Sequence, residues 1–336
     1  MEPSRREFIR RAAEGVLGAA ALGTLRASVV AEEAAPPGDR PLLPIVDTHQ
    51  HLWDLTRFRL PWLSGAGELN RSFVTKDYLE AIAGLNVVKA VYMEVDVVPE
   101  QHAAEAEHVI ELCHRKDSPT CAAVIGGRPA VGGFRGYITR FRGNAYVKGV
   151  RQVLHTGARI CLEQKFVQSL RVLGDLGMSF DLCMGPADLP LAARLTDLCP
   201  DTRFILDHCG NADPKAFRPR GDTAPSHDPE QWRRDMATLA SRKNVVCKIS
   251  GIVASAPKGW TAADLAPIVN HCMETFGPDR VMFGSDWPVC TRGATLRRWV
   301  EALRDIIRTR PEADQRKLLH DNAVRVYGLA SPSPGS

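Results

Sequence analysis

Residues 44–51, PIVDTHQH, form a short apolar run that ends in two histidines, and seven comparable runs follow it along the chain. The β-branched and aromatic residues of these runs, bounded by Gly, Pro and Asn, are typical of strands buried on both faces, as in a parallel sheet. The seven later runs are NVVKAVYMEVD from Asn86, TCAAVIGG from Thr120, YVKGVRQVL from Tyr146, MSFDLCMG from Met178, TRFILDHCG from Thr202, NVVCKISGI from Asn244 and DRVMFGSDWP from Asp279.

Helical spacing of apolar residues separates most of these runs. It is clear in HAAEAEHVIELCHRK, LEQKFVQSLRVLGDLG, PLAARLTDLC, EQWRRDMATLASR, AADLAPIVNHCMETFG and TLRRWVEALRDIIRTR, and weak in GFRGYITRFRG. Eight strand–helix units predict an α/β protein, a single-domain (β/α)8 TIM barrel over residues 44–329. A last helical segment, EADQRKLLHDNAVRVYG, is expected to pack outside the barrel, and residues 330–336 are expected to form a flexible tail.

The first 43 residues differ in composition from the rest. Basic MEPSRREFIRR precedes the apolar stretch AAEGVLGAAALGTL and small residues that end at Ala31. Arg5 and Arg6 resemble the twin-arginine pattern, and the apolar stretch is short for a membrane span. We expect a signal peptide over residues 1–31, a linker over residues 32–43, export to the periplasm by the twin-arginine machinery and no stable membrane anchor. A basic amphipathic helix is the alternative.

The overall composition is that of a globular protein. Hydrophobic residues make up 44% and charged residues 24% of the chain, which predicts a well-buried core. The net charge of +4 is small and gives no indication of a nucleic-acid partner. The nine cysteines form no C-x-x-C pair, and four lie in the eight apolar runs, so they are expected to be buried thiols. Free thiols agree with twin-arginine export, which carries proteins already folded in the reducing cytoplasm.

Polar residues at the ends of the runs are the candidates for catalysis, because the active sites of such barrels lie at the carboxyl ends of the strands. His49 and His51 end the first run, and alternation along a strand lets them share one ligand or metal ion. His208 ends the sixth run, and the Gly and Pro around Asp286 favour exposure of that carboxylate. The alternatives are polar strand ends for the histidine pair, a core histidine for His208 and a helix N-cap for Asp286.

Substrate contacts are expected from other strand ends and from the loops. Arg151 and His155 in the fourth run and Lys248 in the seventh could bind a carboxylate, polarise a carbonyl or form salt bridges across the barrel mouth. The fifth strand offers Asp188 at the same rim. Loops over residues 52–76 and 211–230 are expected to shape the site and exclude water, with Trp53 among the substrate contacts or among the packing residues of its loop.

Several phrases together resemble the amidohydrolase superfamily, and within it the branch of sugar-acid and pyrone-dicarboxylate lactonases. They are DTHQHLWD, GVRQVLH, FDLCM, LDHCGNAD, KISG, MFGSDWP and DNAVRVYG, and they extend from about Pro44 to Leu329. The resemblance implies that Asp286 is the base that activates water and that His49, His51 and His208 line the site. It therefore implies a hydrolase that opens the lactone ring of a sugar acid or related small carboxylic acid.

The sequence departs from the amidohydrolase pattern at residues that would bind a second metal ion. A two-metal amidohydrolase would need a Lys or Glu at the fourth strand and a His after the fifth, but the fourth run ends in Arg151 to His155 and no His lies between His155 and His208. We expect at most one divalent ion, with zinc the first choice, on His49, His51 and Asp286; the resemblance also allows activity without metal. A metal-dependent decarboxylase of the same branch and a non-catalytic sugar-acid binding protein are the rival functions. A metal-dependent deoxyribonuclease would need a Glu at the fourth strand, which is absent.

Overall fold

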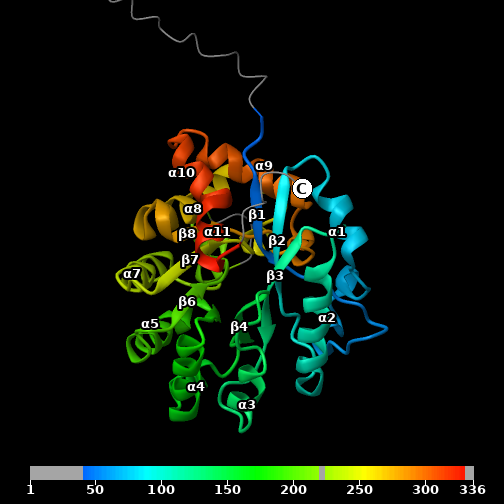
Figure 1. Ribbon diagram of the computed structural model, residues 1–336. Coiled ribbons are helices and arrows are strands. Elements are labelled where there is room, and N and C mark those ends of the chain that lie inside the picture. The colour runs from blue at the N-terminus through cyan, green and yellow to red at the C-terminus, as the bar shows by residue number, and fades with distance from the viewer. Residues whose placement is uncertain (1–40, 219–223, 330–336) are drawn as a thin grey trace, which may run out of the picture. The chain divides into compact units, whose positions relative to one another are not determined.

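The structure is a computed structural model, and it describes residues 41–218 and 224–329. Eight parallel strands follow one another in chain order around a barrel, each paired with the next (Figure 1). Each strand lies within one of the eight apolar runs, so the predicted (β/α)8 TIM barrel is confirmed. The strands are β1 (Ile45–Gln50), β2 (Val87–Met93), β3 (Thr120–Gly126), β4 (Val147–Val153), β5 (Ser179–Cys183), β6 (Arg203–Leu206), β7 (Val245–Ile249) and β8 (Val281–Phe283).

The barrel closes between β1 and β8 at the carboxyl ends of these strands. Gln50 and Trp287 form a parallel bridge there, just beyond the short strand β8. The backbone amide of His51 donates to the Trp287 carbonyl at 2.8 Å, and the amide of Asp286 donates to the His49 carbonyl at 2.9 Å. These bonds fix the ends of the first and eighth strands side by side, which is where the sequence places the candidate catalytic groups.

Helices surround the barrel (Figure 1). In α9, for example, Leu296, Trp299, Val300, Leu303 and Ile307 are buried at helical spacing. All six clear helical patterns form helices, and the weak pattern becomes the short α3. The helices up to this point are α1 (Thr75–Ile82), α2 (His102–His114), α3 (Phe134–Thr139), α4 (Gln164–Asp175), α5 (Leu189–Leu198), α6 (His208–Asn211), α7 (Pro229–Ala240), α8 (Ala262–Phe276) and α9 (Leu296–Ile307).

The last helical segment differs from the expectation. It comprises α10 (Glu312–Arg316), a π-helical turn (Lys317–Asp321) and α11 (Asn322–Tyr327). The prediction that this segment packs outside the barrel is wrong for α11. Its residues Ala323, Val326 and Tyr327 join the cluster of side chains that fills the barrel interior. The amide of Asn322 also donates to the Val281 carbonyl at the start of β8. Apolar residues at positions i, i+3 and i+4 thus cover the amino-terminal end of the barrel.

The expectations about export concern a different part of the chain. The predicted signal peptide, most of the linker and the predicted tail lie outside the described residues, so they stay predictions. Within residues 41–218 and 224–329, no helix has the length and apolar character needed to cross a membrane. Contacts group the chain from Leu42 onward into one compact unit, which begins close to the predicted start of the barrel.

Candidate active site

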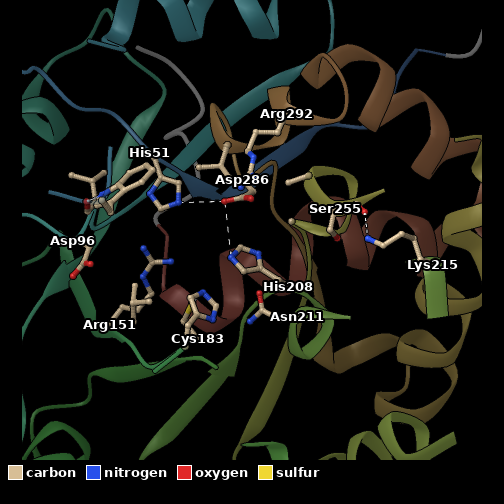
Figure 2. A pocket seen from close by; sticks show the side chains of 17 residues that line it. His51, Asp96, Arg151, Cys183, His208, Asn211, Lys215, Ser255, Asp286 and Arg292 are labelled. Atoms are coloured by element: carbon tan, nitrogen blue, oxygen red, sulfur yellow. Dashed lines mark hydrogen bonds and ion pairs between the residues drawn. The ribbon is translucent and has the colours of Figure 1, made fainter. Parts of the chain in front are cut away.

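Three imidazole rings surround the carboxylate of Asp286. Its Oδ1 lies 3.4 Å from His51 Nε2, 3.7 Å from His49 Nε2 and 4.0 Å from His208 Nε2. Figure 2 shows His51, His208 and Asp286 facing one another at the cavity. The sequence singled out these four residues from three distant strand ends, and the structure brings them together at the carboxyl end of the barrel.

The contacts of each ring decide which nitrogen faces the carboxylate. His51 Nδ1 lies 3.0 Å from the Met93 carbonyl, and because a carbonyl only accepts, Nδ1 is the donor in this contact and Nε2 faces Asp286. His208 Nδ1 lies 2.9 Å from the Ser250 hydroxyl, which leaves Nε2 toward the cavity. Burial lowers the pKa of His208, and it lowers the pKa of His49 well below its usual value. Both of these rings are therefore neutral near pH 7.

The backbone that carries His208 is unusual. All four residues of α6 have positive φ angles, at 53° for His208, 53° for Cys209, 67° for Gly210 and 53° for Asn211. Left-handed backbone is unfavourable by roughly 1–2 kcal/mol for each residue other than glycine, so surrounding contacts must hold it. The Asn211 amide donates to the Met184 carbonyl at 2.8 Å. This turn sends His208 to the cavity wall directly after β6.

Arg151 is held by a carboxylate that the sequence analysis did not single out. Its Nε donates to Glu94 Oε1 at 2.6 Å and its Nη2 donates to the Glu94 carbonyl at 2.8 Å. The remaining Nη1 lies 3.3 Å from His49 Nε2 and 3.8 Å from Asp207 Oδ2. The sequence signal for Glu94 is its place just after β2, where the second run ends in two acidic residues.

Lys248 lies beneath the site and does not line the cavity. Its side chain is fully buried in the barrel, where Nζ donates to Asp181 Oδ2 at 2.6 Å and lies 3.3 Å from Asp207 Oδ1. Burial raises the pKa of Asp181 to about 7. Burial also acts to raise the pKa of Asp207, but Lys248 and His49 outweigh it and hold that pKa well below the usual value. These contacts match the interpretation of Lys248 as a salt-bridge residue, and they do not match a substrate contact.

The cavity above Asp286 has a volume of about 580 Å³. That is within the range of about 300–1,000 Å³ that small-molecule sites occupy. Arg151, Lys215 and Arg292 contribute cationic groups to its wall, and Trp62 contributes an aromatic ring. Lys215 is also paired with Asp213 at 3.0 Å. Lys215 and Arg292 escaped the sequence analysis because each lies in a short 3-10 helix of three or four residues, too short for a periodic pattern that indicates the direction of a side chain.

Of the other predicted substrate contacts, His155 lines the cavity, whereas Trp53 and Asp188 do not. His155 lines the cavity, with its Nε2 3.7 Å from the Cys183 sulfur. Trp53 is buried and packs edge-on against Trp62, with 5.5 Å between the ring centroids. It therefore supports the cavity wall from behind. Asp188 precedes α5 and is absent from the residues that line the cavity.

The residues around Asp286 fit one metal ion. The ligand atoms of His49, His51 and Asp286 all lie within 4.8 Å of one another. Zinc bonds of about 2.0–2.1 Å place tetrahedral ligands about 3.3–3.4 Å apart, close to the separations of 3.4 and 3.7 Å between the Asp286 oxygen and the two rings. Two imidazoles and a carboxylate are also a usual ligand set of catalytic zinc.

A second group of potential ligands is less suited to an ion. It consists of His49, Asp207 and His208, and it shares His49 with the first group. Its carboxylate already lies within 3.8 Å of two cations, Lys248 and Arg151. A second ion would compete with both of these charges, so the geometry agrees with at most one ion at the active site.

Comparison with known proteins assigns nearly the whole described chain to one family. The model of the amidohydrolase family matches residues 46–329. An L-fucono-1,5-lactonase of Burkholderia multivorans is 28% identical over 305 residues, which cover 86% of this chain and 97% of that protein. An L-rhamnono-gamma-lactonase of Scheffersomyces stipitis is 24% identical over 206 residues, which cover 54% of this chain and 59% of that protein.

A similar solved structure is an amidohydrolase of Burkholderia multivorans with bound zinc. It superposes with a TM-score of 0.74 at 24% sequence identity, and the match covers 85% of this chain and all of that one. At this identity the likeness concerns the fold.

Proposed function

The chain belongs to the amidohydrolase family, and on that premise we propose that it is a hydrolase that opens the lactone ring of a sugar acid or a related small carboxylic acid. The observation that carries the proposal is the carboxylate of Asp286, set among three imidazoles at the floor of a cavity with cationic walls. The similarity to two sugar-acid lactonases supports this substrate class.

Asp286 is the proposed general base. Its carboxylate takes a proton from a water molecule, whose oxygen attacks the lactone carbonyl carbon. The bond between that carbon and the ring oxygen then breaks, and the ring oxygen leaves as a hydroxyl group after receiving the proton from Asp286. The product is an open-chain hydroxy acid that carries one more water than the lactone. Its new carboxylate is compatible with the cationic groups of Lys215 and Arg292.

One zinc ion is the proposed cofactor, and His49, His51 and Asp286 are the residues that would hold it. When bound, such an ion supplies polarisation of a carbonyl oxygen and acidification of water. Activity without metal is the alternative. In that case neutral His208 and the Nη1 group of Arg151 are the polar groups that the chain itself offers for stabilising negative charge on the carbonyl oxygen.

Hydrolysis by the Asp286→Asn variant tests the proposal. The amide keeps nearly the same shape but cannot accept the proton, so turnover should fall by roughly two to four orders of magnitude while the protein remains folded. The assay is a panel of aldonolactones and dicarboxylate lactones, with and without chelator, and thermal unfolding is measured on the same preparations. Asp188→Asn is the matched control, because it removes a carboxylate outside the cavity and should leave turnover unchanged.

Other outcomes would replace the proposal. A destabilised Asp286→Asn variant with normal turnover per folded molecule would mean that Asp286 is a structural cap. Metal-dependent release of CO₂ from a carboxylic acid, without lactone hydrolysis, would identify a decarboxylase. Binding of sugar acids with no turnover by the unmodified protein would identify a binding protein.

A further inference from the structure

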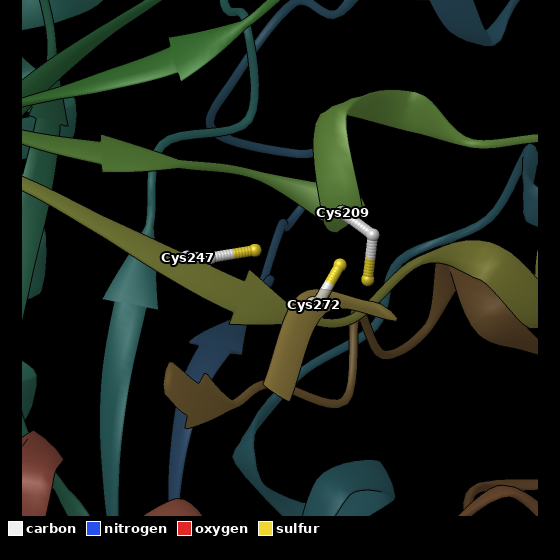
Figure 3. A group of neighbouring side chains, drawn as sticks. All are labelled: Cys209, Cys247 and Cys272. Carbon is white, nitrogen blue, oxygen red and sulfur yellow. The ribbon is translucent and has the colours of Figure 1, made fainter. Parts of the chain in front are cut away.

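Three cysteines from separate elements meet behind the wall of the active site. Cys209 belongs to α6, Cys247 to β7 and Cys272 to α8, and Figure 3 shows their side chains directed toward one another. Their sulfur atoms all lie within 4.8 Å of one another. All three residues have 0% exposure, and all three are free thiols.

The position of each cysteine in its element directs its side chain toward the other two. Cys247 alternates along β7 with Val246 and Lys248, which face the barrel interior, so it faces outward to the helices. Cys272 lies on the buried apolar face of α8. Cys209 lies in the left-handed turn that sends the preceding His208 to the cavity. None of the three is among the residues that line that cavity.

Packing alone does not require this convergence. A buried cysteine generally behaves as a small hydrophobic residue, and five of the other six cysteines of the chain are buried as well. Here the thiols of Cys209 and Cys247 both donate to the carbonyl of Lys248, at 3.6 and 3.8 Å. Burial acts to raise the pKa of the Cys209 thiol, whereas a hydrogen bond with the backbone of Ser250 acts to lower it.

The number of ligands indicates which ion fits. Three sulfurs bonded at about 2.3 Å in a plane around an ion would be about 4.0 Å apart, within the separation that the structure shows. Zinc in structural sites takes four ligands, but this group has three members among the described residues. Thiolates select soft ions, and Cu(I) is a soft ion that does not need a fourth ligand.

We propose that Cys209, Cys247 and Cys272 form a binding site for one Cu(I) ion. Each cysteine that coordinates the ion releases its thiol proton, and no electron is transferred. The ion would link α6, β7 and α8, which already contact one another, and would stabilise the folded chain. The proposal does not rest on the lactonase function, because these residues lie outside the cavity and the test measures copper.

The test is a Cu(I) titration of the full chain, reduced and free of oxygen, against a coloured Cu(I) chelator. We expect one equivalent of tightly bound Cu(I), a thiolate-to-copper absorption band in the ultraviolet and a higher Tm. Cys272→Ala and Cys247→Val should each weaken binding by about 100-fold or more, because one of three ligands is lost. The matched controls are Cys113→Ala in α2 and Cys121→Val in β3, which should bind copper like the unmodified chain.

X-ray absorption of the copper-loaded chain gives a second measurement that needs no variant. The expected result is three sulfur neighbours around copper and no nitrogen neighbours. Nitrogen ligands would assign the copper to the imidazoles of the active site and overturn the proposal. It would also be overturned by the absence of stoichiometric Cu(I) binding, by unchanged binding in both cluster variants, or by preferential binding of Zn(II) at these cysteines.

Discussion

Glu105 in α2 is a buried acid whose proton should control the pH dependence of stability. Its side chain is almost fully buried, and Oε1 accepts hydrogen bonds from the Tyr92 hydroxyl at 2.9 Å and the Val95 amide at 2.8 Å. Burial, and next the neighbouring carboxylate of Glu94, raise the pKa of Glu105 from 4.5 to about 8. Glu105 is therefore protonated in the folded protein at pH 7.

The raised pKa of Glu105 makes the folded state less stable as the pH rises. In the unfolded chain Glu105 loses its proton from about pH 4.5 upward, whereas in the folded chain it keeps the proton until about pH 8. The contribution of Glu105 is therefore most favourable below pH 4.5 and is lost as the pH rises toward 8. At about 1.4 kcal/mol per pH unit, the free energy of unfolding should fall by about 3–4 kcal/mol between pH 5 and pH 8.

Glu105→Gln isolates this contribution. The amide cannot ionise, and its oxygen keeps the acceptor role of Oε1 while its nitrogen replaces Oε2, which has no hydrogen-bond partner in the described part of the chain. Urea unfolding at each pH unit from 5 to 9 should show the stability of the variant relative to the unmodified protein rising by about 3–4 kcal/mol up to pH 8. Titrating groups that do not interact with Glu105 cancel in this difference.

The control is Glu111→Gln, which alters an exposed residue of the same helix. Its stability relative to the unmodified protein should be constant across the same pH range, since its carboxylate stays in water in both states. If the curves for Glu105→Gln and the unmodified chain run parallel from pH 5 to pH 9, Glu105 does not hold a proton in the fold and the argument from burial fails.

Two further predictions concern other parts of the chain. Glu94→Gln removes the charged partner of buried Arg151, so it should lower the free energy of unfolding by about 3 kcal/mol and kcat/KM by about 100-fold. Urea unfolding and lactone hydrolysis measure the two effects, with Glu111→Gln as control; normal values for both would contradict the role of the pair. Replacing Arg5 and Arg6 by Lys should retain the protein in the cytoplasm, as cell fractionation would show, and normal export would exclude the twin-arginine signal.

The barrel was predictable because its signals are local. Each strand is a short apolar run, and the order of strands in a barrel follows the order of the runs. The same local logic places His49, His51, His208 and Asp286 at strand ends, and the structure brings these four side chains together. For the last helix, the apolar spacing indicated a buried face but not the element that this face contacts. The sequence analysis therefore missed that Tyr327 covers the end of the barrel.

The charge pairs inside the barrel were beyond local signals. Alternation along the seventh run puts Lys248 inside the barrel, but only the relative heights of neighbouring strands decide that it meets Asp181 of β5 and Asp207 after β6. Likewise, Arg151 of β4 meets Glu94 across β3. These pairings depend on strand register and tilt, which no single run specifies.

The same charge pairs explain why Asp286 is the carboxylate that remains available for chemistry. Glu94 and Asp207 each lie within 3.8 Å of an arginine or lysine nitrogen, so each is already paired with a cation. The ion contacts of Asp286 are with imidazoles, and burial keeps His49 and His208 neutral. A carboxylate without a fixed cation can accept a proton from water or bind a metal ion. The cations beneath it thus hold the neighbouring acids in place, and Asp286 alone of these three carboxylates faces the cavity.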